Sequence, residues 1–158
     1  MVKTRIITVG KIKEKEMEKL ILEYEKRLSR YTDFSCIQLN DSYVCQNPSD
    51  KDIEEVLKKE SESILKNIPS GMTAVSMAIE GKKYSSEKFA ELIETSKTNG
   101  GLCFIIGSSH GLHKSVLDAS HLKISMSDMT FPHNLARLML TEQIYRGFKI
   151  LNNENYHK

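Results

Sequence analysis

The feature that most restricts the fold is the unbroken apolar run LCFII at residues 102–106, which is followed by Gly107. A short apolar run bounded by glycines is typical of a strand that is covered on both faces in a parallel sheet. Other strand-like stretches lie at 5–10, 34–39, 72–79 and 121–127. Apolar residues at helical spacing occupy the intervals between them. We therefore expect an α/β fold, a mostly parallel sheet with helices on both faces.

Start signals and apolar stripes define the expected helices. Ser49 with Asp52 three residues later is typical of an N-cap and its capping-box partner, and Ser85 or Ser86 caps the next helix. A turn is expected at EGKK, residues 80–83. The first helix has one apolar face made of Met17, Leu20, Ile21, Tyr24 and Leu28. The last helix is expected from about Asn134 to Leu151, with a stripe of Leu135, Leu138, Met139, Tyr145, Phe148 and Leu151.

Length and composition favour one domain covering residues 1–158. The 28% of charged and 39% of hydrophobic residues are typical of a folded chain rather than a disordered one. The longest apolar run is far shorter than the roughly 18 residues of a membrane span, and no signal-peptide core follows the N-terminus. Three cysteines without a CxxC pair indicate neither a disulfide framework nor a zinc site. We expect a cytoplasmic protein with no membrane partner.

The charge distribution is a weak signal for a partner. A net charge of +2 is too small to indicate nucleic acid by itself. Residues 1–31 hold nine Lys and Arg against five Glu, so the N-terminal part is locally basic. Such a run is more often a solvated helix face than a phosphate contact, and we favour the solvated face.

Three strand ends carry unusual residues: SMAIEG at 76–81, IIGSSHGLHK at 105–114 and SMSDMTFPH at 125–133. In a parallel sheet, ligands bind at the carboxyl ends of the strands. Gly107 and Gly111 bracket a turn that would let backbone N–H groups approach a ligand. A phosphate loop is excluded, because a Walker A motif from Gly107 would need a glycine at Leu112 and the GxGxxG fingerprint lacks its second glycine.

Metal and serine-hydrolase chemistry are also disfavoured at these loops. His110, His113 and His121 match no recurrent zinc spacing, so no metal is expected. Ser108 and Ser109 lack the flanking glycines of a GxSxG elbow. The final helix is different, because His133 stands at its start and Arg137, one turn later, shares its face. Several large hydrogen-bonding groups beside two strand-end loops favour a functional site over a solvated edge.

The stretches IIGSSHGL and SMSDMTFPHNLARLMLTEQIYRGFKILNNENYHK resemble the RlmH (YbeA-type) family of SPOUT methyltransferases. VGKIKEK, YEKRL, AIEGKKYSS and the terminal YHK occur in the order of the family, so the resemblance covers essentially the whole chain. It implies a C-terminal trefoil knot, which periodicity does not predict because knots are rare. It also implies a homodimer with the active site at the subunit interface. The implied reaction is methyl transfer from S-adenosyl-L-methionine to N3 of a pseudouridine in an interface stem-loop of 23S ribosomal RNA, in the large subunit.

The resemblance also implies which residues would bind the cofactor. Met77 falls at the first strand-end contact of the family, and Gly107 falls at its backbone contact. The loop that wraps the adenosyl group would consist of Met126, Ser127, Asp128, Met129, Thr130 and Phe131. An adenine needs an apolar slot with backbone hydrogen bonds, which fits loops without an acidic pair. The chain departs from the family at Ser108, where a second glycine is common, and at Ala78, where an acidic residue is common. Serine at 108 is compatible with the turn if its φ is negative.

The implied reaction needs a group that assists loss of the imino proton of the acceptor. Candidates are His133, His157 and, less favoured, Glu142, because a histidine titrates near the operating pH. Arg137 could hold a phosphate or stabilise charge on a uracil carbonyl, and Tyr156 could stack on the target base. The alternatives are a non-catalytic RNA- or ribosome-binding module and, disfavoured by the absent phosphate motifs, a nucleotide hydrolase.

Overall fold

The computed structural model describes residues 1–158 and contains one five-stranded sheet in which all paired strands are parallel. The order across the sheet is β2-β1-β4-β3-β5. All five residues of the central β4 are buried, as expected for a strand covered on both faces. The strands are β1 (Lys3–Val9), β2 (Asp33–Leu39), β3 (Thr73–Lys83), β4 (Leu102–Ile106) and β5 (Leu122–Ser125).

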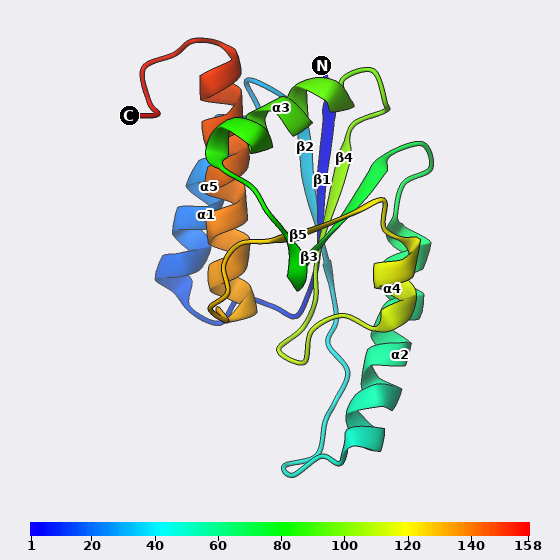
Figure 1. The fold of residues 1–158 in the computed structure, drawn as a ribbon. Coiled ribbons are helices and arrows are strands. Elements are labelled where there is room, and N and C mark those ends of the chain that lie inside the picture. Colours follow the sequence, from blue (N-terminus) through cyan, green and yellow to red (C-terminus); the bar gives the residue numbers. More distant parts are fainter.

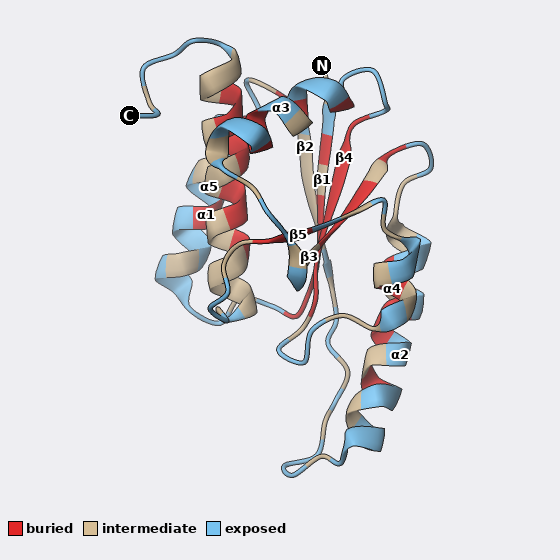
Figure 2. Ribbon diagram, in the orientation of Figure 1, coloured by how far each residue is buried: buried red, intermediate tan, exposed pale blue.

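Helices cover both faces of the sheet, which confirms the expected α/β architecture (Figure 1). One face carries α1 (Lys15–Leu28), α3 (Ser86–Ser96) and α5 (His133–Leu151), and the other carries α2 (Asp50–Asn67) and α4 (Lys114–Ala119). Each side has its own apolar core, and the buried residues line the sheet and the inner sides of the helices (Figure 2). No helix has the length and apolar character needed to cross a membrane.

The predicted start signals of two helices are confirmed. Ser49 accepts a hydrogen bond from the amide of Asp52 at 3.2 Å, and the Asp52 carboxylate accepts one from the amide of Ser49 at 2.8 Å. These two bonds form the capping box of α2. Ser85, the first of the two candidates, caps α3 by accepting from the amide of Lys88 at 3.2 Å.

The predicted turn at residues 80–83 is wrong, because β3 continues through this segment to Lys83. The strand pairs with Ile124 of β5 twice, first at Met77 and then at Lys82, with a register shift between them. Gly81 permits this arrangement, since a Cβ there would lie 2.6 Å from the amide nitrogen of Ile124. Strand β5 covers only Leu122–Ser125 and is therefore shorter than the predicted strand at 121–127.

The predicted apolar faces of two helices need correction. Leu20 of α1 is 46% exposed, whereas Ile21 and Leu28 are buried as expected. On α5 the stripe residues Tyr145 and Phe148 are buried, whereas those near the start of the helix are only half-buried; these are Leu135, Leu138 and Met139. The buried face is instead made of Arg137, Leu140, Thr141, Ile144, Tyr145, Gly147 and Phe148. Helix α5 packs on α3 and α1 with this face and leaves a second, half-exposed apolar face, which explains the difference.

Candidate functional site

The three strand ends singled out in the sequence line one cavity of about 840 Å³. Its walls come from the part of β3 beyond its pairing with β4, the loop after β4, the loop after β5 and the start of α5. Half of the lining residues are apolar, and the volume is within the range of small-molecule sites. The predicted site residues that line it are Met77, Gly107, Met126, Ser127, Met129, Thr130, Phe131 and His133.

The loop after β4 has a tight turn that requires glycine at two positions. A bridge joins Ser108 to Gly111, and the amide of Gly111 donates to the carbonyl oxygen of Ser108 at 2.9 Å. A Cβ on Gly107 would lie 2.2 Å from the carbonyl oxygen of Gly111, so no side chain fits there. Gly111 has φ +87°, a region that L-residues rarely adopt. The backbone of this loop is therefore held close to the cavity.

Ser108 fits the turn because its φ is negative, as it is for every non-glycine residue except Asn153. Its hydroxyl donates a 2.8 Å hydrogen bond to the carboxylate of Glu60 in α2. Burial raises the pKa of Glu60, while the bond from Ser108 acts in the opposite direction. Sequence reasoning missed Glu60, although it stands four residues after Val56 and four before Ile64, on the buried stripe of α2. A carboxylate at such a position is a signal for a buried polar partner.

The loop after β5 is ordered by its own serines. Ser125 donates to the carbonyl oxygen of Ser127 at 2.9 Å, and the hydroxyl of Ser127 accepts from the amide of Met129 at 3.1 Å. Asp128 does not line the cavity, because its carboxylate meets the ammonium of Lys83 at 2.5 Å on the surface. The loop thus presents Met126, Ser127 and Met129 to the cavity and ties its outer side to the end of β3.

His133 is the titratable residue of α5 that lines the cavity. No hydrogen bond within the chain engages either nitrogen of its ring, so the imidazole is free to meet a ligand. The turn after β1 abuts the ring, since a Cβ on Gly10 would lie 3.4 Å from Nε2 of His133. Gly10 also has φ +94°, so a side chain here would strain the backbone, while its Cβ would be in van der Waals contact with the histidine.

Arg137 does not join His133 in the cavity. It is 4% exposed, and its guanidinium pairs with Glu25 of α1 at 3.1 Å. Its Nε and Nη1 atoms have no hydrogen-bond partner in the chain. Burial raises the pKa of the neighbouring Cys36 thiol to about 11. In this chain the arginine therefore connects α1 with α5 and does not line the cavity.

The C-terminal tail is anchored on α5 and α3, away from the cavity of the same chain. The hydroxyl of Tyr156 donates to Glu142 at 3.0 Å, and its ring packs edge-on against Tyr145 at 5.1 Å between centroids. The Nδ1 atom of His157 accepts from Arg146 at 3.3 Å, and its Nε2 atom meets Glu87 at 2.9 Å. Tyr156 and His157 are thus part of a contact network rather than a frayed end.

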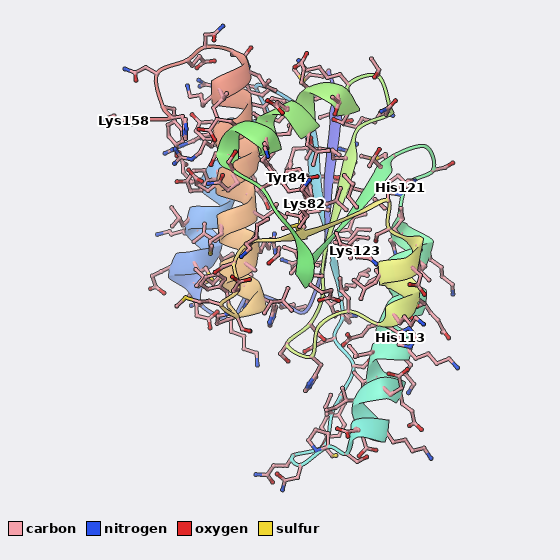
Figure 3. The ribbon with its side chains drawn as sticks, viewed as in Figure 1. Lys82, Tyr84, His113, His121, Lys123 and Lys158 are labelled. Atoms are coloured by element: carbon pink, nitrogen blue, oxygen red, sulfur yellow. The ribbon has the colours of Figure 1, made fainter.

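Of the other histidines of the strand-end region, His110 lines the cavity, whereas His113 and His121 have structural partners. His113 caps α4 by accepting from the amide of Ser115 at 3.1 Å and meets Glu54 of α2 at 2.8 Å. His121 accepts from the amide of Ala74 at 2.9 Å. Figure 3 shows both residues on the side of the molecule that carries α2 and α4. No group of three or more potential metal ligands occurs in the structure.

Comparisons with known proteins agree with this arrangement. A family model described as "Predicted SPOUT methyltransferase" matches residues 2–157. A curated relative from Methanococcus vannielii, named "Putative ribosomal RNA large subunit methyltransferase H", is 46% identical over 155 residues, 97% of this chain and 98% of the relative.

Two solved structures share the fold at low sequence identity. A structure described as a probable methylase family protein from Haemophilus influenzae has a TM-score of 0.53 and 14% identity, over 100% of this chain and 72% of that one. A second, described only as a hypothetical protein, has a TM-score of 0.56 and 11% identity, over 95% of this chain and 68% of that one.

Proposed function

Because the chain belongs to the SPOUT methyltransferase family, we propose that it transfers a methyl group from S-adenosylmethionine to large-subunit ribosomal RNA in the cytoplasm. The observation that carries the proposal is the single cavity in which the three strand ends meet beside the free imidazole of His133. The name of the Methanococcus vannielii relative supports ribosomal RNA as the substrate class. N3 of a pseudouridine is the acceptor that we propose within this class.

The cavity fits S-adenosylmethionine, which SPOUT methyltransferases use in general. The apolar side chains of Met77, Met126 and Phe131 suit an adenine, and the bare backbone at Gly107 allows close approach. We propose that the loop after β5 holds the adenosyl group while Asp128 fixes the outside of this loop through Lys83. When bound, the cofactor supplies a methyl group that is already activated as a sulfonium.

The residues of the chain then have to orient the acceptor and remove its proton. We propose that the imidazole of His133 takes the imino proton, because the residue lines the cavity and its ring nitrogens have no hydrogen-bond partner in the chain. Alignment of acceptor and donor supplies much of the remaining rate enhancement. Arg137 is proposed to support this histidine indirectly, by fixing α5 against Glu25 of α1.

A homodimer is part of the proposal. Leu135, Leu138 and Met139 give α5 a half-exposed apolar face that a second copy could cover. Tyr156 and His157 lie outside the cavity of their own chain, which supports a site completed across a subunit interface. The trefoil knot is proposed with it, from the membership of the chain in the SPOUT methyltransferase family.

The test is a methyl-transfer assay with labelled S-adenosylmethionine on assembled ribosomes and on isolated ribosomal RNA, followed by mapping of the modified nucleotide. We expect one modified pseudouridine in 23S ribosomal RNA. His133→Gln should lower the rate of transfer by roughly 100-fold or more, the usual size of a general-base contribution, without weakening cofactor binding. Absence of S-adenosylmethionine binding by the folded protein in calorimetry would instead favour a non-catalytic RNA-binding module.

A further inference from the structure

A second hollow of about 260 Å³ lies between the end of β3 and the outer side of α3. Its lining combines cations with an aromatic ring and consists of Lys82, Tyr84, Lys88, Glu91, Leu92 and Thr95. Neither the cavity of the proposed methyl transfer nor its mechanism uses any of these residues. We call this hollow the β3–α3 groove.

The ring of Tyr84 has a fixed position at the base of the groove. Tyr84 and Leu92 are partly buried and pack against the larger apolar core, so the ring is held from beneath. The ammonium of Lys82 lies 5.9 Å from the centroid of the ring. A half-buried aromatic ring beside a cation is the arrangement on which single-stranded nucleic acids stack a base and place a phosphate.

The lining of the groove carries two lysines against one glutamate. Lys82 and Lys88 are exposed, and neither takes part in an ion pair within the chain. Figure 3 shows Lys82 and Tyr84 close together at the end of β3. Glu91 is the one acidic residue that lines the groove. The surface therefore favours a polyanion over an acidic or neutral small molecule.

The groove also connects two segments that the proposed function uses. At one end Lys83, next to Lys82, pairs with Asp128 of the loop after β5 at 2.5 Å. At the other end Glu87, next to Lys88, meets Nε2 of His157 at 2.9 Å. A strand of RNA in the groove would thus pass between the cofactor loop and the C-terminal tail.

We propose that the β3–α3 groove binds a single-stranded or looped segment of RNA, with Tyr84 stacking on a base and Lys82 and Lys88 contacting phosphates. The inference rests on the proposed function in taking RNA as the substrate, and it adds where a part of the RNA outside the target nucleotide is held. Exposed lysines alone would bind any polyanion, whereas a ring in the groove selects unpaired bases.

The experiment measures binding of a fluorescein-labelled single-stranded RNA of roughly ten nucleotides by anisotropy, at several salt concentrations and without cofactor. Lys82→Glu/Lys88→Glu should lower the slope of log affinity against log salt by at least about 1.4, since each phosphate contact contributes about 0.7. The matched control is Lys51→Glu/Lys59→Glu, which makes the same change of charge on exposed residues of α2. Equal losses in both double variants would overturn the proposal in favour of general charge attraction.

The ring is tested separately with two variants of Tyr84. Tyr84→Phe should bind like the wild type, and Tyr84→Leu, which keeps an apolar contact with the core, should bind on the order of tenfold more weakly. Thermal unfolding of both variants checks that the core is intact. Equal affinities of Tyr84→Leu and wild type, or equal affinities for duplex and single-stranded RNA, would contradict the stacking.

Failure of the two proposals can be told apart. If the wild type methylates ribosomal RNA and Lys82→Glu/Lys88→Glu has an unchanged KM for RNA, the groove is excluded and the proposed function stands. If the wild type binds the oligonucleotide through the groove but methylates no ribosomal RNA, the proposed function fails and the groove stands.

Discussion

The hydroxyl of Ser108 donates a 2.8 Å hydrogen bond to the carboxylate of Glu60, and this bond joins the loop after β4 to the middle of α2. Glu60 is 5% exposed, so the loop that lines the cavity is tied to a buried carboxyl group. The serine side chain provides a connection that a glycine at this position would lack. The bond should fix the backbone around Gly107 and thereby the cavity wall.

Ser108→Ala should destabilise the protein and weaken cofactor binding. The variant leaves the buried carboxylate with one donor fewer, which costs about 1–3 kcal/mol. For a domain of this size each kcal/mol corresponds to a melting temperature about 2–4 °C lower. Ser70→Ala is the control, because Ser70 is exposed, its side chain makes no hydrogen bond in the chain and it does not line the cavity. Equal melting temperatures and S-adenosylmethionine affinities in the two variants would contradict the role of the bond.

Glu60→Gln should change how stability depends on pH. The pKa of Glu60 is raised in the folded protein, so the folded state holds its proton more tightly than the unfolded chain. Stability is therefore lost as pH rises from the ordinary carboxyl pKa through the raised one, and the loss persists at neutral pH. The variant lacks this loss. The difference between the melting temperature of the variant and that of the wild type should increase from acidic to neutral pH. A difference that stays constant over this pH range would refute the prediction.

Gly107→Ala should displace the loop after β4, whereas Gly111→Ala should be milder. The new Cβ at 107 would lie 2.2 Å from the carbonyl oxygen of Gly111. The backbone at 107 would have to move away from the backbone at 111 to relieve this clash, and that movement would open the turn. No atom lies within 4 Å of a Cβ built at Gly111. Only the positive φ disfavours alanine there, and this conformation costs about 1–2 kcal/mol. Calorimetry should show at least tenfold weaker cofactor binding for Gly107→Ala, about 1.4 kcal/mol, than for Gly111→Ala. The reverse order would exclude Gly107 as the close-approach position.

The parts of the fold that depend on local pattern could be predicted from the sequence. The apolar run of β4, the capping box at Ser49 and the glycine-bounded loop at Gly107 each follow from neighbours within a few residues. The meeting of three strand ends then follows from the parallel sheet, because carboxyl ends of parallel strands share an edge.

The parts that depend on distant partners could not be predicted. Glu60 meets a serine 48 positions away, and Arg137 meets a glutamate 112 positions away, so neither contact leaves a local signal. The continuation of β3 to Lys83 likewise depends on its second pairing with β5, although Gly81 and two lysines locally favour a turn. The register of the buried face of α5 is set by α1 and α3 rather than by its own apolar residues.

The three cysteines should differ in their reactivity toward a thiol reagent at mildly alkaline pH. Burial raises the pKa of Cys36 to about 11 and that of Cys103 to about 12, so both stay protonated, whereas Cys45 is exposed. The reagent attacks thiolates, and the native protein should therefore react rapidly at Cys45 alone. Unfolded protein should react at all three positions. Rapid labelling of Cys103 in the native protein would contradict the central position of β4.

Deletion of Tyr156, His157 and Lys158 should abolish methyl transfer while leaving the fold and cofactor binding largely intact. The tail lines no part of the cavity, so calorimetry should give an unchanged affinity for S-adenosylmethionine. The deletion removes the edge-on packing of Tyr156 on Tyr145, which is worth about 0.5–1.5 kcal/mol, and the melting temperature should fall by only a few degrees.

Tyr156→Phe separates the ring of the tail residue from its hydroxyl. This variant loses only the 3.0 Å hydrogen bond to Glu142 and keeps the ring beside Tyr145 and Arg146. If the ring is what meets the RNA base, the variant should retain most of the methyl transfer that the deletion abolishes. Full activity of the truncated protein would exclude the tail from the site, and loss of activity in Tyr156→Phe would assign the role to the hydroxyl. In either case the cofactor affinity, measured on the same preparations, shows whether the change acts on the RNA side of the reaction alone.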